Sequence, residues 1–335
     1  MGQYLKLIGP IMIIGLTLGG LILVADPQAV LRTLLGANLA MLVALAALIL
    51  IFFTAQGLRW HFLLGQVGAR LRPRDSLLLN MAGQSVSALI PLGDLTRAVF
   101  ASEATGVPVG QVAATVTVQE LGYTTLMLIA ATPVLLAVRD GVGLVAATAA
   151  GLLVIMASLT NDGLYGLLRR GLTSLPIVRR FALTIDELRQ RSGQLLRTPA
   201  TWLGLTLDGL RAIAGISVVW LIAHAFAPGV LGWWQAAFAL VLSFVAGAIS
   251  FVPGGVGATE ASLVAVLWLF HVSPPAAVAT AALERLAFTG TPAAMGLVCY
   301  LIARRRFPIG SLLRLKMASG PADSQSGDGP LANAA

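Results

Sequence analysis

The sequence has few charged residues and very little cysteine or histidine. Of its 335 residues, 11% are Asp, Glu, Lys or Arg, whereas an ordinary soluble protein has roughly 25%. A soluble fold of this size could not cover its surface with so few charges, so the composition indicates a membrane protein. The single cysteine, Cys299, lies inside an apolar run, which excludes a disulfide-stapled fold.

Sequence patterns typical of catalysis are also absent. There is no nucleophile elbow, no P-loop and no Asp-rich metal motif. His61, His224 and His271 are far apart and have no carboxylate at ligand spacing, which argues against a metal site. We therefore predict no catalytic residue, no metal and no cofactor, and we expect that the protein is not an enzyme.

Hydrophobic residues make up 57% of the chain and form long runs. A helix needs about 20 apolar residues to cross a bilayer core. The first run has no small-residue cleavage site followed by a soluble domain, so we interpret it as a retained span and not as a signal peptide. The continuous runs predict six membrane helices, at 5–24, 38–58, 109–138, 143–160, 202–226 and 275–303.

Two further hydrophobic stretches, 77–103 and 234–270, are interrupted by proline and glycine. Proline lacks an amide hydrogen and glycine is the weakest non-proline helix former, so a helix does not pass smoothly through either interruption. Glycine-rich turns that lead into a helix can also bind anions, although a tight reversal alone would explain them. The residues predicted as hinges or gates are Pro91, Gly93, Pro253, Gly254, Gly255 and Gly257.

The net charge of +8 suggests a nucleic-acid partner until the positions of the basic residues are considered. Most of them lie beside apolar spans, in 59–74, 161–199 and 304–316, while the connections between these regions have almost none. The positive-inside rule then places both termini and the 161–199 connection in the cytoplasm. In 161–199, leucines and arginines alternate as in amphipathic helices on a membrane surface. We predict contact with lipid headgroups and no nucleic-acid binding.

This topology requires each interrupted stretch to enter and leave on the same side of the membrane. Three short crossings would also satisfy it, but the second arm of each stretch is short, which favours re-entrant hairpins. The predicted fold is an all-α polytopic membrane protein with about six full transmembrane helices plus two re-entrant broken hairpins in an inverted repeat. We expect residues 1–305 to form the membrane domain and 306–335 a mostly disordered cytoplasmic tail.

Several charged residues lie in apolar surroundings, where an ion at the bilayer centre costs about 2.5–3.5 kcal/mol on insertion scales. Such residues persist when they are paired or line a wet cavity. Asp208 and Arg211 are three positions apart, so a structural pair on one helix face explains them as well as a functional role does. The predicted lipid-binding residues around a central cavity are Asp94, Arg97, Glu120, Glu260, Glu284 and Arg285.

Two segments carry a family resemblance: 90–97, with Pro91, Gly93, Asp94 and Arg97, and 251–262, with Pro253, the glycines and Glu260. Together with 274–285, they resemble the lysylphosphatidylglycerol synthase transmembrane-region family over about residues 5–305. The resemblance implies a flippase-like membrane domain. The chain ends about 30 residues after its last predicted span. We therefore expect that the soluble aminoacyl-transfer domain of the full synthases is absent and that the chain does not transfer aminoacyl groups.

These observations favour a lipid flippase or lipid-binding transporter of the bacterial inner membrane, with both termini in the cytoplasm. We expect Arg97 and Arg285 to attract a headgroup phosphate, and Asp94 and Glu260 to suit an amine or aminoacyl group. The expected partners are membrane lipids, anionic or aminoacylated, and the sequence leaves open a homo-oligomer or partners in envelope assembly. A lipid-modifying transferase and a non-transporting accessory protein in envelope or glycolipid assembly remain alternatives.

Overall fold

The computed structural model describes residues 27–36, 38–87, 95–137, 141–172, 182–250 and 252–309. Throughout these residues the regular elements are helices, and there is no strand. Their bounds are α2 (Pro27–Leu35), α3 (Leu39–Gln66), α4 (Pro73–Ser87), α5 (Thr96–Thr105), α6 (Val109–Ala137), α7 (Gly141–Thr160), α8 (Asp162–Leu172), α10 (Ala182–Arg197), α11 (Pro199–Leu203), α12 (Leu205–Phe226), α13 (Trp233–Ile249), η2 (Pro253–Gly255), α14 (Ala258–Leu269), α15 (Pro274–Arg285), η3 (Leu286–Gly290) and α16 (Thr291–Arg306).

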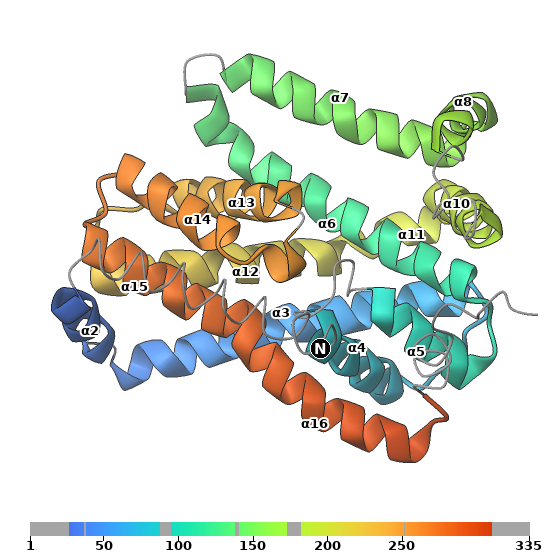
Figure 1. Ribbon diagram of the computed structural model, residues 1–335, viewed down its shortest axis with the longest axis horizontal. Coiled ribbons are helices and arrows are strands. Elements are labelled where there is room, and N and C mark those ends of the chain that lie inside the picture. The colour runs from blue at the N-terminus through green and yellow to red at the C-terminus, as the bar shows by residue number, and fades with distance from the viewer. Residues whose placement is uncertain are drawn as a thin grey trace, which may run out of the picture.

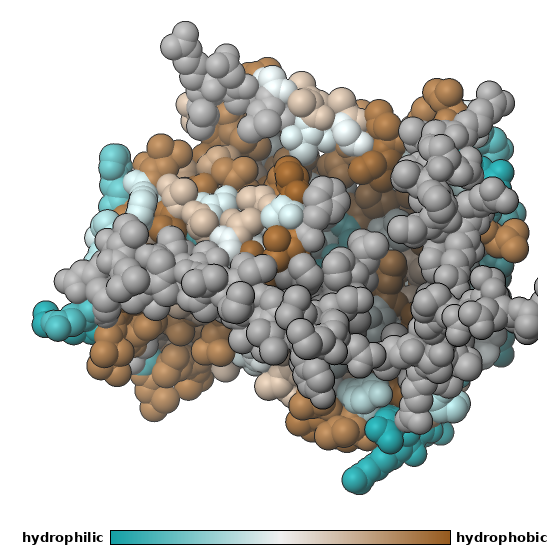
Figure 2. All heavy atoms as spheres, in the orientation of Figure 1, coloured by the Kyte–Doolittle hydropathy of each residue, from teal (hydrophilic) through white to brown (hydrophobic). Residues whose placement is uncertain are grey.

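The protein is a multi-pass membrane protein. Among the described residues, 4 helices are long and apolar enough to cross a bilayer: Leu39–Gln66, Val109–Ala137, Pro199–Phe226 and Pro274–Arg306. They confirm the sequence-predicted helices at these positions. The predicted span 143–160 corresponds to α7, whereas 5–24 lies outside the described residues. In Figure 2, hydrophobic residues cover the flanks of the molecule, and hydrophilic ones gather near α2, near α8 and at the end of α16.

Both interrupted stretches consist of two short helices. The helices α4 and α5 lie on either side of residues 88–94, which include Pro91, Gly93 and Asp94 and fall outside the described residues. The helices α13 and α14 are joined by the predicted glycine turn, in which Gly254, Gly255 and Gly257 have φ of 65°, 63° and 86°. In each pair the two helices pack against each other. The pairs extend from opposite ends of the molecule (Figure 1).

Close packing at glycine holds the second pair together. A Cβ atom on Gly255 would lie 2.9 Å from Cα of Gly247 in α13 and 2.6 Å from Oγ1 of Thr259 in α14. Gly255 also has a positive φ, which side chains other than glycine rarely adopt. The glycine turn therefore sets the distance between α13 and α14 as well as the reversal of the chain.

The arginine-rich segments lie together at one end of the molecule. Figure 1 shows α8, α10, the end of α3 and the end of α16 on the right, with α2 and the α12–α13 connection on the left. At the right-hand end, an Arg306–Asp75 ion pair of 2.8 Å joins α16 to α4. Helices α8 and α10 are joined by Tyr165, which donates a 2.6 Å hydrogen bond to Asp186. Burial and this bond raise the pKa of Tyr165 to about 12, so its phenol remains a donor at neutral pH.

Candidate functional site

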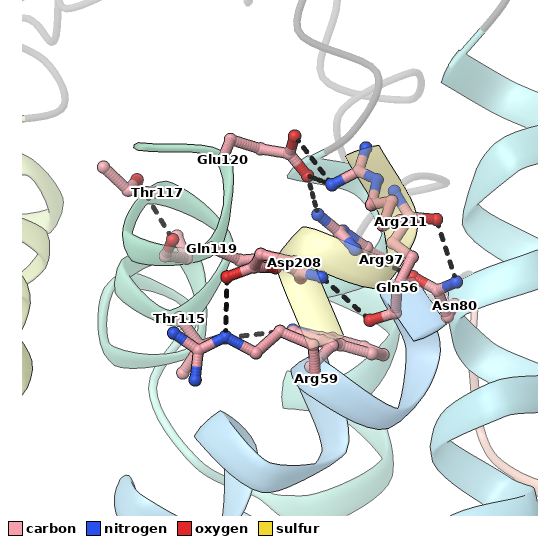
Figure 3. Close-up of polar contacts among 12 residues, drawn as sticks. Gln56, Arg59, Asn80, Arg97, Thr115, Thr117, Gln119, Glu120, Asp208 and Arg211 are labelled. Carbon is pink, nitrogen blue, oxygen red and sulfur yellow. Dashed lines mark hydrogen bonds and ion pairs between the residues drawn. The ribbon is translucent and has the colours of Figure 1, made fainter. Parts of the chain in front are cut away.

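A layer of polar side chains separates two apolar cores. One core includes Phe52, Tyr123 and Ile216, and the other includes Trp60, Phe100 and Val112. Between them, α3, α4, α5, α6 and α12 contribute buried polar residues: Gln56, Arg59, Asn80, Arg97, Gln119, Asp208 and Arg211. Figure 3 shows these side chains converging from separate helices. Because an unpaired polar group in an apolar interior is costly, each contact in this layer matters to the fold.

Glu120 of α6 lies between two arginines and is the accessible member of the group. Arg97 Nη2 is 2.8 Å from Oε1 of Glu120, and Arg211 Nη1 is 3.1 Å from each of its carboxylate oxygens. The side chain of Glu120 is 31% exposed, whereas those of Arg97 and Arg211 are 0% and 7% exposed. Figure 3 shows the carboxylate of Glu120 directed toward the two guanidinium groups, and its side chain is the most exposed of the three.

The orientation of Arg97 is fixed by its neighbours. Its Nη1 donates a 2.8 Å hydrogen bond to Oδ1 of Asn80, and Nδ2 of Asn80 donates to Oε1 of Gln56 at 3.2 Å. Cζ of Arg97 lies 5.5 Å from the ring centroid of Trp60. Helix α4 approaches this arginine closely at Gly83, where a Cβ atom would lie 2.8 Å from Cβ of Arg97. The first helix pair thus holds its arginine in one place.

Arg211 is held by aromatic rings as well as by Glu120. Its Cζ lies 3.9 Å from the ring centroid of Tyr123 and 4.9 Å from that of Phe52. A guanidinium over an aromatic face is stabilised by the electrostatic potential of the ring, and more strongly where water is excluded. Arg211 was not among the predicted lipid-binding residues, although its position in an apolar run was a signal for it.

Arg59 and Asp208 form a second ion pair below Glu120. Arg59 Nε donates to Oδ2 of Asp208 at 2.9 Å, and the two side chains are 1% and 0% exposed. Gly204 and Gly122 leave room for the two charged groups. This arrangement corrects the assignment of Arg59 to a basic loop, because Arg59 belongs to α3. It also shows that the partner of Asp208 in this ion pair is Arg59 and not Arg211, the pairing that the sequence left open. The apolar Phe62, Leu63 and Leu64 after Arg59 were a signal that α3 continues.

A second charged cluster surrounds the glycine turn between α13 and α14. Arg285 Nε is 3.1 Å from Oε1 of Glu260, and its Nη1 donates to the carbonyl oxygen of Gly254 at 2.9 Å. The backbone N–H of Gly257 donates to Oε2 of Glu260 at 2.7 Å. Glu260 thus caps the first turn of α14, and Arg285 ties α15 to the turn.

The predicted site residues fall into these two clusters and not into one group. Arg97 and Glu120 meet in the polar layer, while Glu260, Glu284 and Arg285 meet at the glycine turn. Asp94 lies outside the described residues, so its predicted pairing with Arg97 is not described. Tyr123 lies between the clusters, within electrostatic range of Glu120 and of Glu284.

The charges in this site are arginines and carboxylates, which suit polar headgroups. Guanidinium groups bind phosphate and carboxylate through paired hydrogen bonds, and a carboxylate binds an amine. Over the described ranges, no three His, Cys, Asp or Glu side chains are arranged to hold a metal ion.

The comparison with protein families covers most of the chain. Residues 8–296 match the family described as the lysylphosphatidylglycerol synthase transmembrane region. The chain belongs to this family. The matched range includes both charged clusters and both interrupted stretches, which confirms the resemblance seen in the sequence. No curated protein matches the sequence.

Proposed function

We propose that this protein is a flippase-like transporter that binds a phospholipid, anionic or aminoacylated, and moves it across the bacterial inner membrane. The observation that carries the proposal is the partly exposed side chain of Glu120, whose carboxylate is held by the buried Arg97 and Arg211 within membrane-embedded helices. Charged groups at such a depth are costly, and in membrane proteins they mark pathways for polar substrates. A headgroup is the polar part of a lipid that would use such a pathway.

The polar layer offers both kinds of charge to a headgroup. A phosphate would bind the guanidinium groups of Arg97 and Arg211 in competition with Glu120, because arginine pairs with phosphate through two parallel hydrogen bonds. An amine or aminoacyl group would instead pair with the carboxylate of Glu120. The exposed apolar flanks of the surrounding helices would leave the acyl chains in lipid.

The proposal includes an inverted repeat of two re-entrant hairpins. Its support is that α4–α5 and α13–α14 extend from opposite ends and that each pair precedes a long helix, α6 or α15–α16. Each following helix forms an ion pair with the second arm of its hairpin, through Arg97–Glu120 and Glu260–Arg285, with the signs exchanged. At about 1.5 Å per residue, the 10 residues of α5 and the 12 of α14 are too short to cross a core of about 30 Å.

We also propose that the arginine-rich end faces the cytoplasm, with both termini on that side. The clustering of α8, α10 and the basic end of α16 at one end supports this orientation, because basic loops are retained on the cytoplasmic side. The amphipathic α8 and α10 would then lie at the inner leaflet beside anionic lipids.

Purified protein in liposomes tests this function. The liposomes carry a fluorescent phosphatidylglycerol in both leaflets, and a membrane-impermeant quencher reports how fast inner-leaflet lipid reaches the outside. We expect loss of fluorescence beyond the outer-leaflet fraction, and no chemically altered lipid. A new lipid species would indicate a transferase, whereas neither movement nor product would indicate an accessory role. Either result would overturn the proposal.

A further inference from the structure

Among the residues that the structure describes, Glu284 is a buried acid without a counterion of its own. It belongs to α15, its residue is 2% exposed, and its Oε2 accepts no hydrogen bond within the described part of the chain. The neighbouring side chain of Arg285 is already engaged, by Glu260 through Nε and by the Gly254 carbonyl through Nη1. Glu260 and Glu284 therefore both lie near a single arginine, Arg285, and Arg285 is paired with Glu260.

Within the described helices, the other charged or titratable groups near Glu284 do not supply a second positive charge. Among the helices packed on α15, α14 contributes the acid Glu260. Tyr123 of α6 is within electrostatic range, and its hydroxyl also has no hydrogen-bond partner among the described residues. From α12, Arg211 lies with Cζ 3.9 Å from the centroid of the Tyr123 ring and binds Glu120. Asp208 of the same helix pairs with Arg59, and His224 stacks on Trp220. Arg32 of α2 donates to Gln28 at an exposed position.

The helix that carries Glu284 is irregular directly after it. Residues Leu286–Gly290 form a π-helical segment between α15 and α16. Such segments are rare, occur frequently at functional sites, and replace the regular hydrogen-bond spacing of the α-helix. A small change of winding here would rotate Glu284 and Arg285 relative to the glycine turn.

We propose that Glu284 is a proton-binding site and that release of its proton loosens the contact of Arg285 with the glycine turn. A neutral acid is far less costly to bury than an isolated carboxylate. Once ionised, Glu284 competes with Glu260 and with the Gly254 carbonyl for the guanidinium of Arg285. The tether between α15 and the turn then weakens, which frees the α13–α14 hairpin to move.

This site would couple proton exchange to lipid movement, and that link rests on the proposed function. Glu284 is in the same cluster as Glu260, and Tyr123 connects this cluster to the polar layer around Glu120. A proton gradient would then drive the hairpin in one direction, and the lipid would move with it.

Infrared spectroscopy of the purified protein tests the proton site without any transport. We expect wild type at neutral pH to show a carbonyl band of a protonated carboxyl in an apolar environment. The band should be lost in Glu284→Gln and retained in Glu187→Gln, whose acid in α10 is exposed. Glu284→Asp, which keeps the acid, should shift the band. Identical spectra for wild type and the folded Glu284 variants would overturn the site.

The coupling is tested in the liposome assay with an imposed pH gradient. We expect the gradient to change the rate of lipid movement several-fold in wild type and to have little effect in Glu284→Gln. Movement that ignores the gradient in wild type would overturn the coupling and leave the proposed function intact. If wild type moves no lipid, the proposed function and the coupling fail together, and the infrared result still decides whether Glu284 binds a proton.

Discussion

At the scale of single residues, the membrane interior of this protein is organised by ion pairs between distant parts of the chain. Arg59 and Asp208 are 149 positions apart, and Arg211 and Glu120 are 91 apart. The sequence indicates which charges lie in apolar runs, because that depends on neighbouring residues alone. It does not indicate their partners. The spacing of Asp208 and Arg211 allowed a pair on one helix face, whereas in the fold Asp208 bonds to α3 and Arg211 bonds to α6.

The Arg59–Asp208 pair gives a prediction about stability. Asp208→Asn should lower the free energy of unfolding by about 3–5 kcal/mol, because it leaves the charge of Arg59 buried without a partner. Replacing the arginine too, as Arg59→Met with Asp208→Asn, should recover most of the loss, since no buried charge then remains. Thermal unfolding in detergent measures both. A double variant no more stable than Asp208→Asn would mean that the pair contributes more than mutual neutralisation.

At the scale of helices, the sequence predicts most of what the structure contains. Helix breaks are caused by local backbone chemistry, so proline and glycine at 253–257 were sufficient to place the turn between α13 and α14. The ends of helices were predicted less well. Helix α3 extends to Gln66, beyond the expected end at 58, because its last turns bury Trp60, Leu63 and Leu64 against neighbouring helices. The apolar residues after Arg59 indicated this continuation, but the residue at which α3 ends depends on the packing.

The close contact at the glycine turn predicts a position-specific effect of a methyl group. Gly255→Ala should destabilise the protein by about 1–3 kcal/mol, because the methyl group would meet α13 and the residue has a positive φ. Gly151→Ala is the control: it lies in α7 with no atom within 4 Å of its Cβ position, and should be neutral or stabilising by up to about 1 kcal/mol. Equal melting temperatures for the two variants would show that the turn tolerates the methyl group.

At the scale of the whole molecule, charge patterning predicted which segments share an end. The segments near α8, α10 and the end of α16 do lie together, although they are far apart in sequence. The pattern counted Arg59 with them incorrectly, because a charge beside an apolar run can be in a loop or in a buried pair. The grouping of the site residues into two clusters also had no sequence signal, since it depends on how the helices cross.

The orientation in the membrane is tested by cysteine labelling. In a Cys299→Ala background, Arg70→Cys and Gln190→Cys each place one thiol at an exposed position of the arginine-rich end, and Pro228→Cys places one at the other end. We expect a membrane-impermeant thiol reagent added to intact cells to label only Pro228→Cys, and lysis to expose the other two. Labelling of Gln190→Cys in intact cells would reverse the proposed topology.

The most direct test of the central claim is the rate at which labelled phosphatidylglycerol crosses liposome membranes that contain Glu120→Gln, at equal amounts of folded protein. Wild type should accelerate the movement over protein-free liposomes. Glu120→Gln should slow it by at least about tenfold, equivalent to about 1.4 kcal/mol in the barrier. Asp162→Asn, the same change at a side chain that is 93% exposed, should match wild type. Wild type no faster than protein-free liposomes, or Glu120→Gln as fast as wild type, would contradict the account.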